Sequence, residues 1–454
     1  MSPPKPAPRP DRVSLWRYFQ LFRQDILSAQ PARLYRAKMA EFRTPFFRSY
    51  FCNTPELVDL VLRQRPRDFP KSDRIREGLA PLLRNSVFVT NGETWARQRR
   101  IIDPAFEGGK LHHSFPDMWQ AGRNCVNRLA KNTSERIDIE PETSHVAADV
   151  IFRTLFSIPI EDKTAARVFE SFRAHQNSAP VVNLAALLPL PRWLPRPHSR
   201  KTLQTARVIR KLIETLTRRR AEAIRAGTAP DDLATKIMTM EDPQTGTRLS
   251  TGEMVDQVAI FFLAGHETSA SALAWALYLL ATHPEWQERV AIEAATLPDT
   301  GAAPPMGVLK QLKISRAVFR EAMRLYPPVP MFVREATCPE TFREREVKPG
   351  SQIVISPWHL HRHEGLWENP DGFDPARWET ENGKTCARSA YIPFSAGARV
   401  CPGAGFAMAE GVLILSMILQ RFRLEAHCDR IPEPAAQLTV RSRNGIWLTL
   451  SPRQ

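Results

Sequence analysis

The feature that most constrains the fold of this chain is a long apolar stretch with a clear helix start and a clear helix stop. Ser250 and Glu253 form a capping box ahead of the stretch, and Pro284 biases the residue before it away from helical geometry. A helix from Ser250 to Thr282 would span about 33 residues, or roughly 50 Å at about 1.5 Å per residue. The segment Val258–Leu263 is apolar all round. We therefore expect this helix to cross the centre of a large helical domain.

Weaker patterns place other elements and favour a mainly α fold with a small β portion. Thr54 followed by Pro55 predicts the start of a helix that reaches about Leu62. The expected strands are Phe46–Cys52, Phe342–Val347 and Gln352–Ser356 on either side of a turn at Pro349-Gly350, and a hairpin at Asn444-Gly445. The Pro-rich stretch Leu188–Pro197 is interpreted as a loop, because helical patterns resume on both sides of it. We expect one domain over residues 31–454 and an N-terminal extension over 1–30.

The charge balance and the cysteines limit the partners and the compartment. There are 63 Lys plus Arg against 48 Asp plus Glu, which gives a net charge of +15. Such a surplus favours an acidic partner or an anionic membrane surface, and nucleic acid less, because the basic residues form no compact block. The 6 cysteines show no CxxC spacing, which is typical of a reducing compartment. No signal peptide or membrane-spanning run is recognised, so a soluble cytoplasmic protein is expected.

An amphipathic segment occupies the N-terminal extension. Leu15, Phe19, Phe22 and Ile26 follow helical spacing, and Trp16 stands beside them. A helix of this kind more often docks on its own domain than lies on a bilayer. We expect docking, with peripheral membrane contact as the alternative.

The most informative motif is the stretch Phe394–Gly403, which leads into a helix expected at Ala404–Gln420. Its glycines permit tight turns and the close approach of a flat ligand, and Pro402 suits a first helical position. Cys401 stands just before the helix N-terminus, where free N–H groups favour a thiolate. Such a thiolate could bind iron, whereas a lone cysteine is more often a small buried residue.

This stretch resembles the haem-binding signature of the cytochrome P450 family, Phe-x-x-Gly-x-Arg-x-Cys-x-Gly. All five fixed positions are matched, by Phe394, Gly397, Arg399, Cys401 and Gly403. The resemblance implies the cytochrome P450 fold, with the long central helix over the haem, and a soluble haem-thiolate monooxygenase of bacterial type. It also implies that Cys401 binds the iron, that Phe394 packs beside the sulfur, and that Arg399 pairs with a haem propionate.

A second resemblance lies in the segment Ala264–Ser269 of the long helix. A central Gly265 with a nearby Thr268 suggests a local opening of the helix, whereas a single packing glycine is the simpler interpretation. The segment resembles the family's oxygen-activation motif. That likeness implies that the Thr268 hydroxyl assists dioxygen activation and that Glu267 relays protons.

Further motifs appear in the order that the family has them. Glu321 and Arg324 share a helix face, which taken alone is common on solvated helices. In the family an equivalent pair is buried and joined by a downstream arginine, which implies a structural cluster with Arg377. Trp95 and Arg99 also share a helix face. Together with Arg334 they resemble family residues that hold the haem propionates.

The resemblance implies a cofactor and partners. The cofactor is haem b, and the reaction inserts one oxygen atom of dioxygen into a substrate and reduces the other to water. The chain ends too soon after Cys401 for a fused electron-transfer domain. We therefore expect electrons from NAD(P)H to arrive through a separate ferredoxin reductase and a ferredoxin. That ferredoxin would dock near Arg97, Arg100 and the Cys401 loop.

The substrate is expected to be an apolar small molecule. The candidate pocket residues are Phe261, Phe262, Ala264, Val329, Met331 and Phe332, with parts of Lys71–Thr90. Two other functions stay open. One is a peroxide-driven haem peroxygenase, which needs no acid–alcohol pair. The other is a helical protein that binds an apolar ligand without catalysis.

Overall fold

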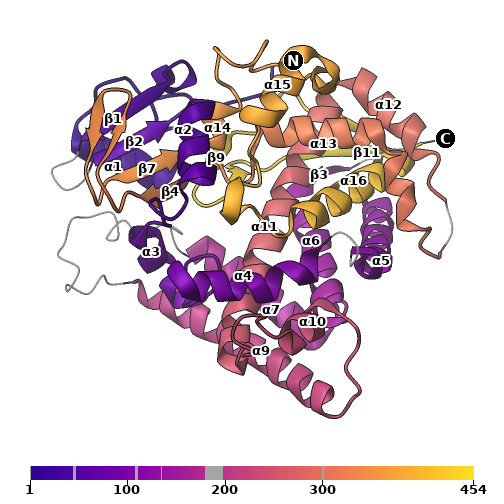
Figure 1. The fold of residues 1–454 in the computed structure, drawn as a ribbon. Helices are drawn as coiled ribbons and strands as arrows, with labels where there is room; N and C mark the ends of the chain where they lie inside the picture. The colour runs from indigo at the N-terminus through magenta and orange to yellow at the C-terminus, as the bar shows by residue number, and fades with distance from the viewer. Residues whose placement is uncertain are drawn as a thin grey trace.

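The long helix expected from the sequence, α11 (Thr251–Thr282), runs through the middle of the molecule (Figure 1). The capping box is formed: Glu253 N–H donates to Ser250 Oγ at 3.2 Å, and Ser250 N–H donates to the Glu253 carboxylate at 2.8 Å. Most of α11 is buried, because α6 (Ile139–Phe156), α9 (Arg200–Arg225), α13 (Lys313–Leu325) and α16 (Ala404–Arg421) pack around it. The expected long, buried central helix is confirmed.

The computed structural model describes residues 2–43, 48–107, 111–133, 135–178, 198–298 and 301–453. Most of these residues are helical, as expected. The other helices are α1 (Leu15–Gln24), α2 (Pro55–Asp59), α3 (Asp73–Leu83), α4 (Gly92–Phe106), α5 (Leu111–Leu129), α7 (Lys163–Ser178), α10 (Leu233–Thr239), α12 (Pro284–Ala294), α14 (Pro357–Leu360) and α15 (Glu381–Ser389). The loop expected at Leu188–Pro197 lies outside the described residues.

The β portion is small and divided among separate sheets. A four-stranded sheet has the order β1 (Met39–Arg43), β2 (Arg48–Cys52), β7 (Gln352–Ile355) and β4 (Phe332–Glu335). It lies to one side of α11 in Figure 1, next to α1. A three-stranded sheet has the order β3 (Arg136–Asp138), β11 (Trp447–Pro452) and β8 (Phe422–Ala426). Both sheets join segments that lie far apart in the sequence.

Three local expectations are wrong. The stretch Phe342–Val347 is itself a hairpin, in which β5 (Glu340–Phe342) pairs with β6 (Arg345–Val347) around two residues with positive φ, 45° and 67°. The turn at Asn444-Gly445 joins no hairpin, because β10 (Val440–Ser442) pairs with β9 (Pro434–Ala436), and β11 pairs with β3 and β8. Pro402 was expected at the first helical position, but it lies outside α16, because the N-cap of that helix is Gly403.

The N-terminal residues pack against the rest of the chain. Pro4 accepts a hydrogen bond from the Tyr326 hydroxyl at 2.8 Å, and Arg9 forms a β-bridge with Pro31. Helix α1 begins at Leu15 and turns one face toward the domain, while Trp16 on the other face is 73% exposed. Phe22 packs against the main hydrophobic core, but no residue of α1 is fully buried and Leu15 is 39% exposed, so the docking of this helix stays a prediction.

One helix in the described part of the chain, α16, is long and apolar enough to cross a membrane. Inside the protein 67% of it is buried, and it follows directly on the Cys401 loop. A helix buried to this extent is typical of a protein core.

Candidate active site

A cavity of about 650 Å³ lies between α11, α4 and the loop that precedes α16. Phe261, Ala264, Gly265 and Thr268 of α11 line it, because residues three and four positions apart share a helix face. Cys401 faces it from the loop before α16. The cavity therefore brings together the two motifs that the sequence singled out.

The Cys401 loop is held by backbone contacts on both sides. Cys401 N–H donates to the Phe394 carbonyl at 2.9 Å, and the Val400 carbonyl accepts from Arg99 Nη1 at 2.8 Å. Gly397 has a φ of +65°, and a Cβ placed there would lie 2.0 Å from the Leu62 carbonyl oxygen. Only glycine fits at such a position. These contacts fix where the cysteine sulfur lies.

The Cys401 thiol is open to the cavity although protein surrounds it on its other sides. Burial raises its pKa, while a hydrogen bond from Gly403 N–H and the charge of Arg99 lower it. Burial has the larger effect, so the helix N-terminus alone does not produce a thiolate. A bound metal ion would, because coordination deprotonates a thiol.

The oxygen-motif segment of α11 is an unbroken helix, so the expected local opening is not observed. The Thr268 hydroxyl instead donates to the Ala264 carbonyl one turn earlier, at 2.5 Å. A Cβ on Gly265 would lie 2.5 Å from Cδ1 of Ile151 on α6. Gly265 therefore allows α6 and α11 to approach closely, as the simpler interpretation of a packing glycine predicts.

Glu267 points away from the cavity wall. It is 4% exposed, and its Oε1 lies 3.3 Å from Nη2 of Arg441, whose side chain is 42% exposed. Burial raises the pKa of Glu267, and the positive charge of Arg441 opposes that shift. The pair joins a buried carboxyl group to the protein surface. Sequence reasoning missed Arg441, because β10 carries no motif that marks it.

A family model described as Cytochrome P450 matches residues 16–448, which is nearly the whole chain. The chain is a cytochrome P450. It is 32% identical over 415 residues to cyclooctat-9-en-7-ol 5-monooxygenase of Streptomyces melanosporofaciens, covering 91% of this chain and 86% of that protein. It is 31% identical over 418 residues to cytochrome P450 4A11 of Homo sapiens, covering 87% and 78%.

The fold comparison agrees. The crystal structure of the cytochrome P450DA heme domain superposes with a TM-score of 0.84, covering 100% of this chain and 98% of that one, at 23% identity. This cytochrome P450 is therefore an oxidoreductase with monooxygenase relatives, and membership of the family implies haem iron, dioxygen and an electron donor.

A cluster of basic side chains in the cavity wall fits the haem of a cytochrome P450. Lys71, Arg99, Arg334 and Arg399 all line the cavity, and within the described chain only Arg99 has a carboxylate partner, Asp103 at 2.8 Å. The buried Nε atoms of Arg334 and Arg399 have no hydrogen-bond partner among described residues. Buried positive charge without a counterion is costly. The two propionates of a haem would supply the missing negative charge.

The electrostatics of this cluster support the same ligand. Burial lowers the pKa of Lys71 to about 6, and the charges of Arg334, Arg399 and Arg99 add to the shift. Burial and Arg399 lower the pKa of Arg334 to about 9. The indole of Trp95 lies beneath two of these cations, with Arg399 Cζ 5.0 Å and Lys71 Nζ 5.6 Å from its ring centre.

Lys71 is a member of this cluster that sequence reasoning did not identify, although it had placed the segment near the pocket. A β-bridge sets Lys71 beside Arg334, and its Nζ donates to the Val87 and Thr90 carbonyls at 2.6 and 3.1 Å. Its position depends on segments more than 200 residues apart. A pattern within the segment does not reveal it.

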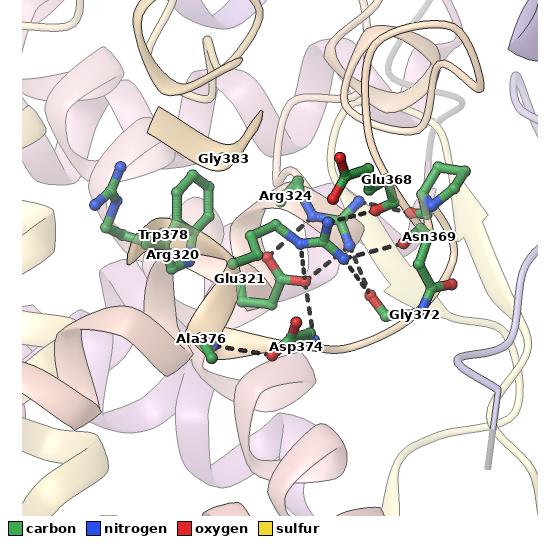
Figure 2. Close-up of polar contacts among 12 residues, drawn as sticks. Arg320, Glu321, Arg324, Glu368, Asn369, Gly372, Asp374, Ala376, Trp378 and Gly383 are labelled. Atoms are coloured by element: carbon green, nitrogen blue, oxygen red, sulfur yellow. Dashed lines mark hydrogen bonds and ion pairs between the residues drawn. The ribbon is translucent and has the colours of Figure 1, made fainter. Parts of the chain in front are cut away.

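The three expected structural residues, Glu321, Arg324 and Arg377, lie together in one buried cluster. Glu321 binds Arg324 at 2.8 Å and Arg377 at 3.0 Å, and all three side chains are at most 5% exposed. Figure 2 shows that backbone carbonyls of the following loop, among them that of Gly372, surround the guanidinium groups. Both buried arginines thus donate hydrogen bonds to these carbonyl oxygens in place of water.

The remaining pocket residues divide by helix face. Val329, Met331 and Phe332 line the cavity, as the sequence predicts. Phe262 does not line it. Its ring packs on the far side of α11 against those of Phe152 and Phe172, at 4.6 and 4.7 Å between centres. Neighbouring residues on a helix point about 100° apart, which explains why Phe261 and Phe262 face different ways.

Arg97 and Arg100 were expected to contribute to partner docking, but the guanidinium groups of both are already paired within the protein. Arg97 donates to Glu253 at 2.7 Å and to the Arg248 carbonyl at 2.7 Å. Arg100 binds the buried Asp242 at 2.6 Å. Both side chains therefore stabilise the connection between α4 and the loop before α11.

A second buried carboxyl group, that of Glu410, lies next to Ser269 in the cavity wall. Glu410 of α16 is 1% exposed, and its Oε2 accepts from the Ser269 hydroxyl at 2.7 Å. Burial raises its pKa to about 8, so the carboxyl group is protonated at neutral pH.

Proposed function

We propose that this cytochrome P450 inserts one oxygen atom of dioxygen into an apolar small molecule, with haem b held by Cys401. The observation that carries the proposal is a single cavity lined by Cys401, by Thr268 and by basic side chains that lack carboxylate partners. The lining of the cavity around Phe261, Met331 and Phe332 supports an apolar substrate.

The residues of this chain would divide the work as follows. Cys401 would supply the sulfur that binds the haem iron, and Phe394 and Gly403 would hold that sulfur in place. Lys71, Trp95, Arg99, Arg334 and Arg399 would bind the propionates. A haem bound in this way supplies the redox chemistry that activates dioxygen. The cluster of Glu321, Arg324 and Arg377 would keep the preceding loops in position.

Proton delivery would depend on two side chains of α11. The Thr268 hydroxyl lies in the cavity wall and can exchange its bond to the Ala264 carbonyl for one to a bound ligand. Glu267 is reached from the protein surface through Arg441. A carboxyl group so placed can pick up a proton at the surface side and pass it toward Thr268 through water.

Electrons would come from a separate acidic ferredoxin and its NAD(P)H-dependent reductase in the cytoplasm. The net charge of +15 favours an acidic partner, and the six cysteines are all unpaired. Contact of the exposed Trp16 with a membrane surface stays a secondary proposal. We propose residues 31–454 as the haem domain and residues 1–30 as a segment that packs on it.

The test is the Cys401→Ala variant beside the native protein, both expressed with adequate haem precursor. The native protein should give a thiolate-type carbonyl spectrum after reduction and oxidise an apolar substrate with reductase, ferredoxin and dioxygen. The variant should lose both properties. A thiolate-type spectrum in the variant would refute the assignment of the sulfur ligand. Turnover of the native protein with hydrogen peroxide, and none with ferredoxin, would favour a peroxygenase instead.

A further inference from the structure

A carboxylate, that of Asp103 on α4, stands beside the basic cluster of the cavity wall. The Nε atom of Arg99 lies 2.8 and 2.9 Å from its two oxygens. The Nη1 atom of the same guanidinium donates to the Val400 carbonyl at 2.8 Å. Val400 directly precedes Cys401 in the loop that faces the cavity. Arg99 therefore joins Asp103 to the residue next to the expected iron ligand.

The two members of this pair lie at different depths. The side chain of Arg99 is 13% exposed and lines the cavity, whereas that of Asp103 is 38% exposed and does not line it. Among the described residues, none accepts a hydrogen bond from Arg99 Nη2. The guanidinium thus keeps a donor for a ligand in the cavity, while Asp103 holds it from the outer side.

The helix itself disfavours a carboxylate at position 103. Asp103 lies in the last turn of α4, where the negative end of the helix dipole opposes a negative charge. An arginine that precedes its acidic partner by one turn is also the less favourable order for a helical ion pair. Burial raises the pKa of Asp103, Arg99 lowers it, and the charge of Glu107 raises it further. Helix stability therefore does not explain why an acid stands here.

The charge of Asp103 acts on the sulfur of Cys401. Burial raises the pKa of that thiol most, the Gly403 N–H and the charge of Arg99 lower it, and the charge of Asp103 raises it. A negative charge that disfavours a thiolate also disfavours the addition of an electron to an iron bound by that thiolate, because both place negative charge at the same point. The pair is therefore suited to adjust how easily a bound haem is reduced.

We infer that Asp103 is a positioning residue that lowers the reduction potential of the haem, by its own charge and by holding Arg99 against the Cys401 loop. The step concerned transfers one electron from a separate donor to ferric haem and gives ferrous haem, and no covalent bond forms or breaks. Without Asp103, the charge of Arg99 is uncompensated and stabilises the ferrous state. The inference rests on the proposed function, since it requires a haem on Cys401, and it concerns the control of electron entry at that site.

The test is a potentiometric titration of the substrate-free holoenzyme between the ferric and ferrous states, with dithionite as reductant. Asp103→Asn should favour reduction by about three- to tenfold in the equilibrium constant, or about 30–60 mV toward higher potential at about 59 mV per tenfold change for one electron. Asp103→Ser should shift the potential in the same direction, and Asp103→Glu, which keeps the charge, should stay close to the native value. The shift should shrink as salt rises, because Asp103 is partly exposed and its field is screened.

Glu107→Gln is the matched control for the loss of one negative charge. Glu107 is the next charged residue along the chain, and its side chain is exposed. Its removal should change the potential by clearly less than Asp103→Asn does. Equal shifts in the two variants would reduce the effect to general surface charge and overturn the inference. An unchanged or lower potential in Asp103→Asn would overturn it as well.

Unfolding of the same samples tests a purely structural role. Because the end of α4 disfavours a carboxylate, Asp103→Asn should leave the midpoint of denaturant unfolding nearly unchanged. A lower midpoint together with a native potential would make the pair a helix clamp and refute the inference. All variants should keep the thiolate-type carbonyl spectrum. Its absence from the native protein would refute the proposed function, whereas the inference alone fails when the spectrum is present and the potentials agree.

Discussion

The carboxyl group of Glu267 lies 3.3 Å from the guanidinium of Arg441, a residue that enters from the last tenth of the chain. Glu267 is buried beside the cavity, and the Arg441 side chain reaches solvent. Since Arg441 stabilises the ionised form, it brings the pKa of the carboxyl group closer to its ordinary range than burial alone would allow.

We therefore expect Glu267→Gln to slow oxygen-dependent product formation by roughly 100-fold, a usual effect of losing a proton-transfer group. Arg441→Gln should move the corresponding inflection in the pH–rate profile to higher pH, because the pKa of Glu267 rises when the positive charge is removed. Arg443→Gln, one residue past the end of β10 and paired with Glu433 at 3.8 Å, should leave the profile unchanged. An identical profile in native protein and both Glu267→Gln and Arg441→Gln would contradict this role.

Removing the negative charge of Glu321 from its buried cluster is expected to cause a large loss of stability. Glu321→Gln leaves Arg324 and Arg377 buried with no negative partner, which should lower the free energy of unfolding by about 3–5 kcal/mol. Glu214→Gln provides the control, since Glu214 and Arg218 form an exposed pair whose loss costs about 1 kcal/mol or less. Denaturant unfolding of the holoenzyme measures both. Equal effects of the two substitutions would show that the cluster is not a main source of stability.

The close approach of α6 and α11 predicts a steric penalty at Gly265. Gly265→Ala places a Cβ against Ile151 and should destabilise the fold by about 1–3 kcal/mol, more than the gain of about 1 kcal/mol in helix propensity. Gly252→Ala, in the same helix with no atom within 4 Å of the added Cβ, should be neutral or stabilising. Adding Ile151→Val removes the nearest atom and should recover part of the loss. Thermal unfolding of the native protein, of Gly265→Ala, of Ile151→Val and of the double variant gives the coupling between the two sites.

Glu410 predicts a pH dependence of stability. Its pKa is raised to about 8 in the folded protein, whereas the unfolded chain releases the proton near the ordinary value of a glutamic acid. Between these values the folded state binds more protons, so its stability falls as pH rises, by at most about 1.4 kcal/mol per pH unit from this group. Glu410→Gln keeps the contact with Ser269 and should remove that slope. Glu433→Gln, at an exposed site, should not.

The fold was predictable where the signals are local. The boundaries of α11 follow from Ser250, Glu253 and Pro284, all within a few residues of the helix ends. Strand pairing was not predictable, because β11 pairs with β3, a strand from the first third of the chain. The turn residues Asn444 and Gly445 mark a bend, but the partners of the flanking strands are chosen by the tertiary structure.

The same distinction between local and long-range signals holds for the residues of the candidate site. Cys401 and Thr268 stand in motifs that can be read along the sequence, and the structure places both at one cavity. Lys71 and Arg441 come from segments without a motif, and each reaches the site through contacts with distant segments. Phe262 shows an error that the sequence could have avoided, since helical spacing from Ala264 and Thr268 selects Phe261 instead.

The contacts of the N-terminal residues have a consequence for how the protein is made. Asp25 is fully buried and accepts a hydrogen bond from Ala436 N–H, a residue 411 positions later. When residues 2–30 leave the ribosome, the surface that covers them has not yet been synthesised, and loop closure over such a separation is slow. The part of the cavity lined by Arg9 and α1 can therefore close only near the end of synthesis, after the central helices have had time to assemble.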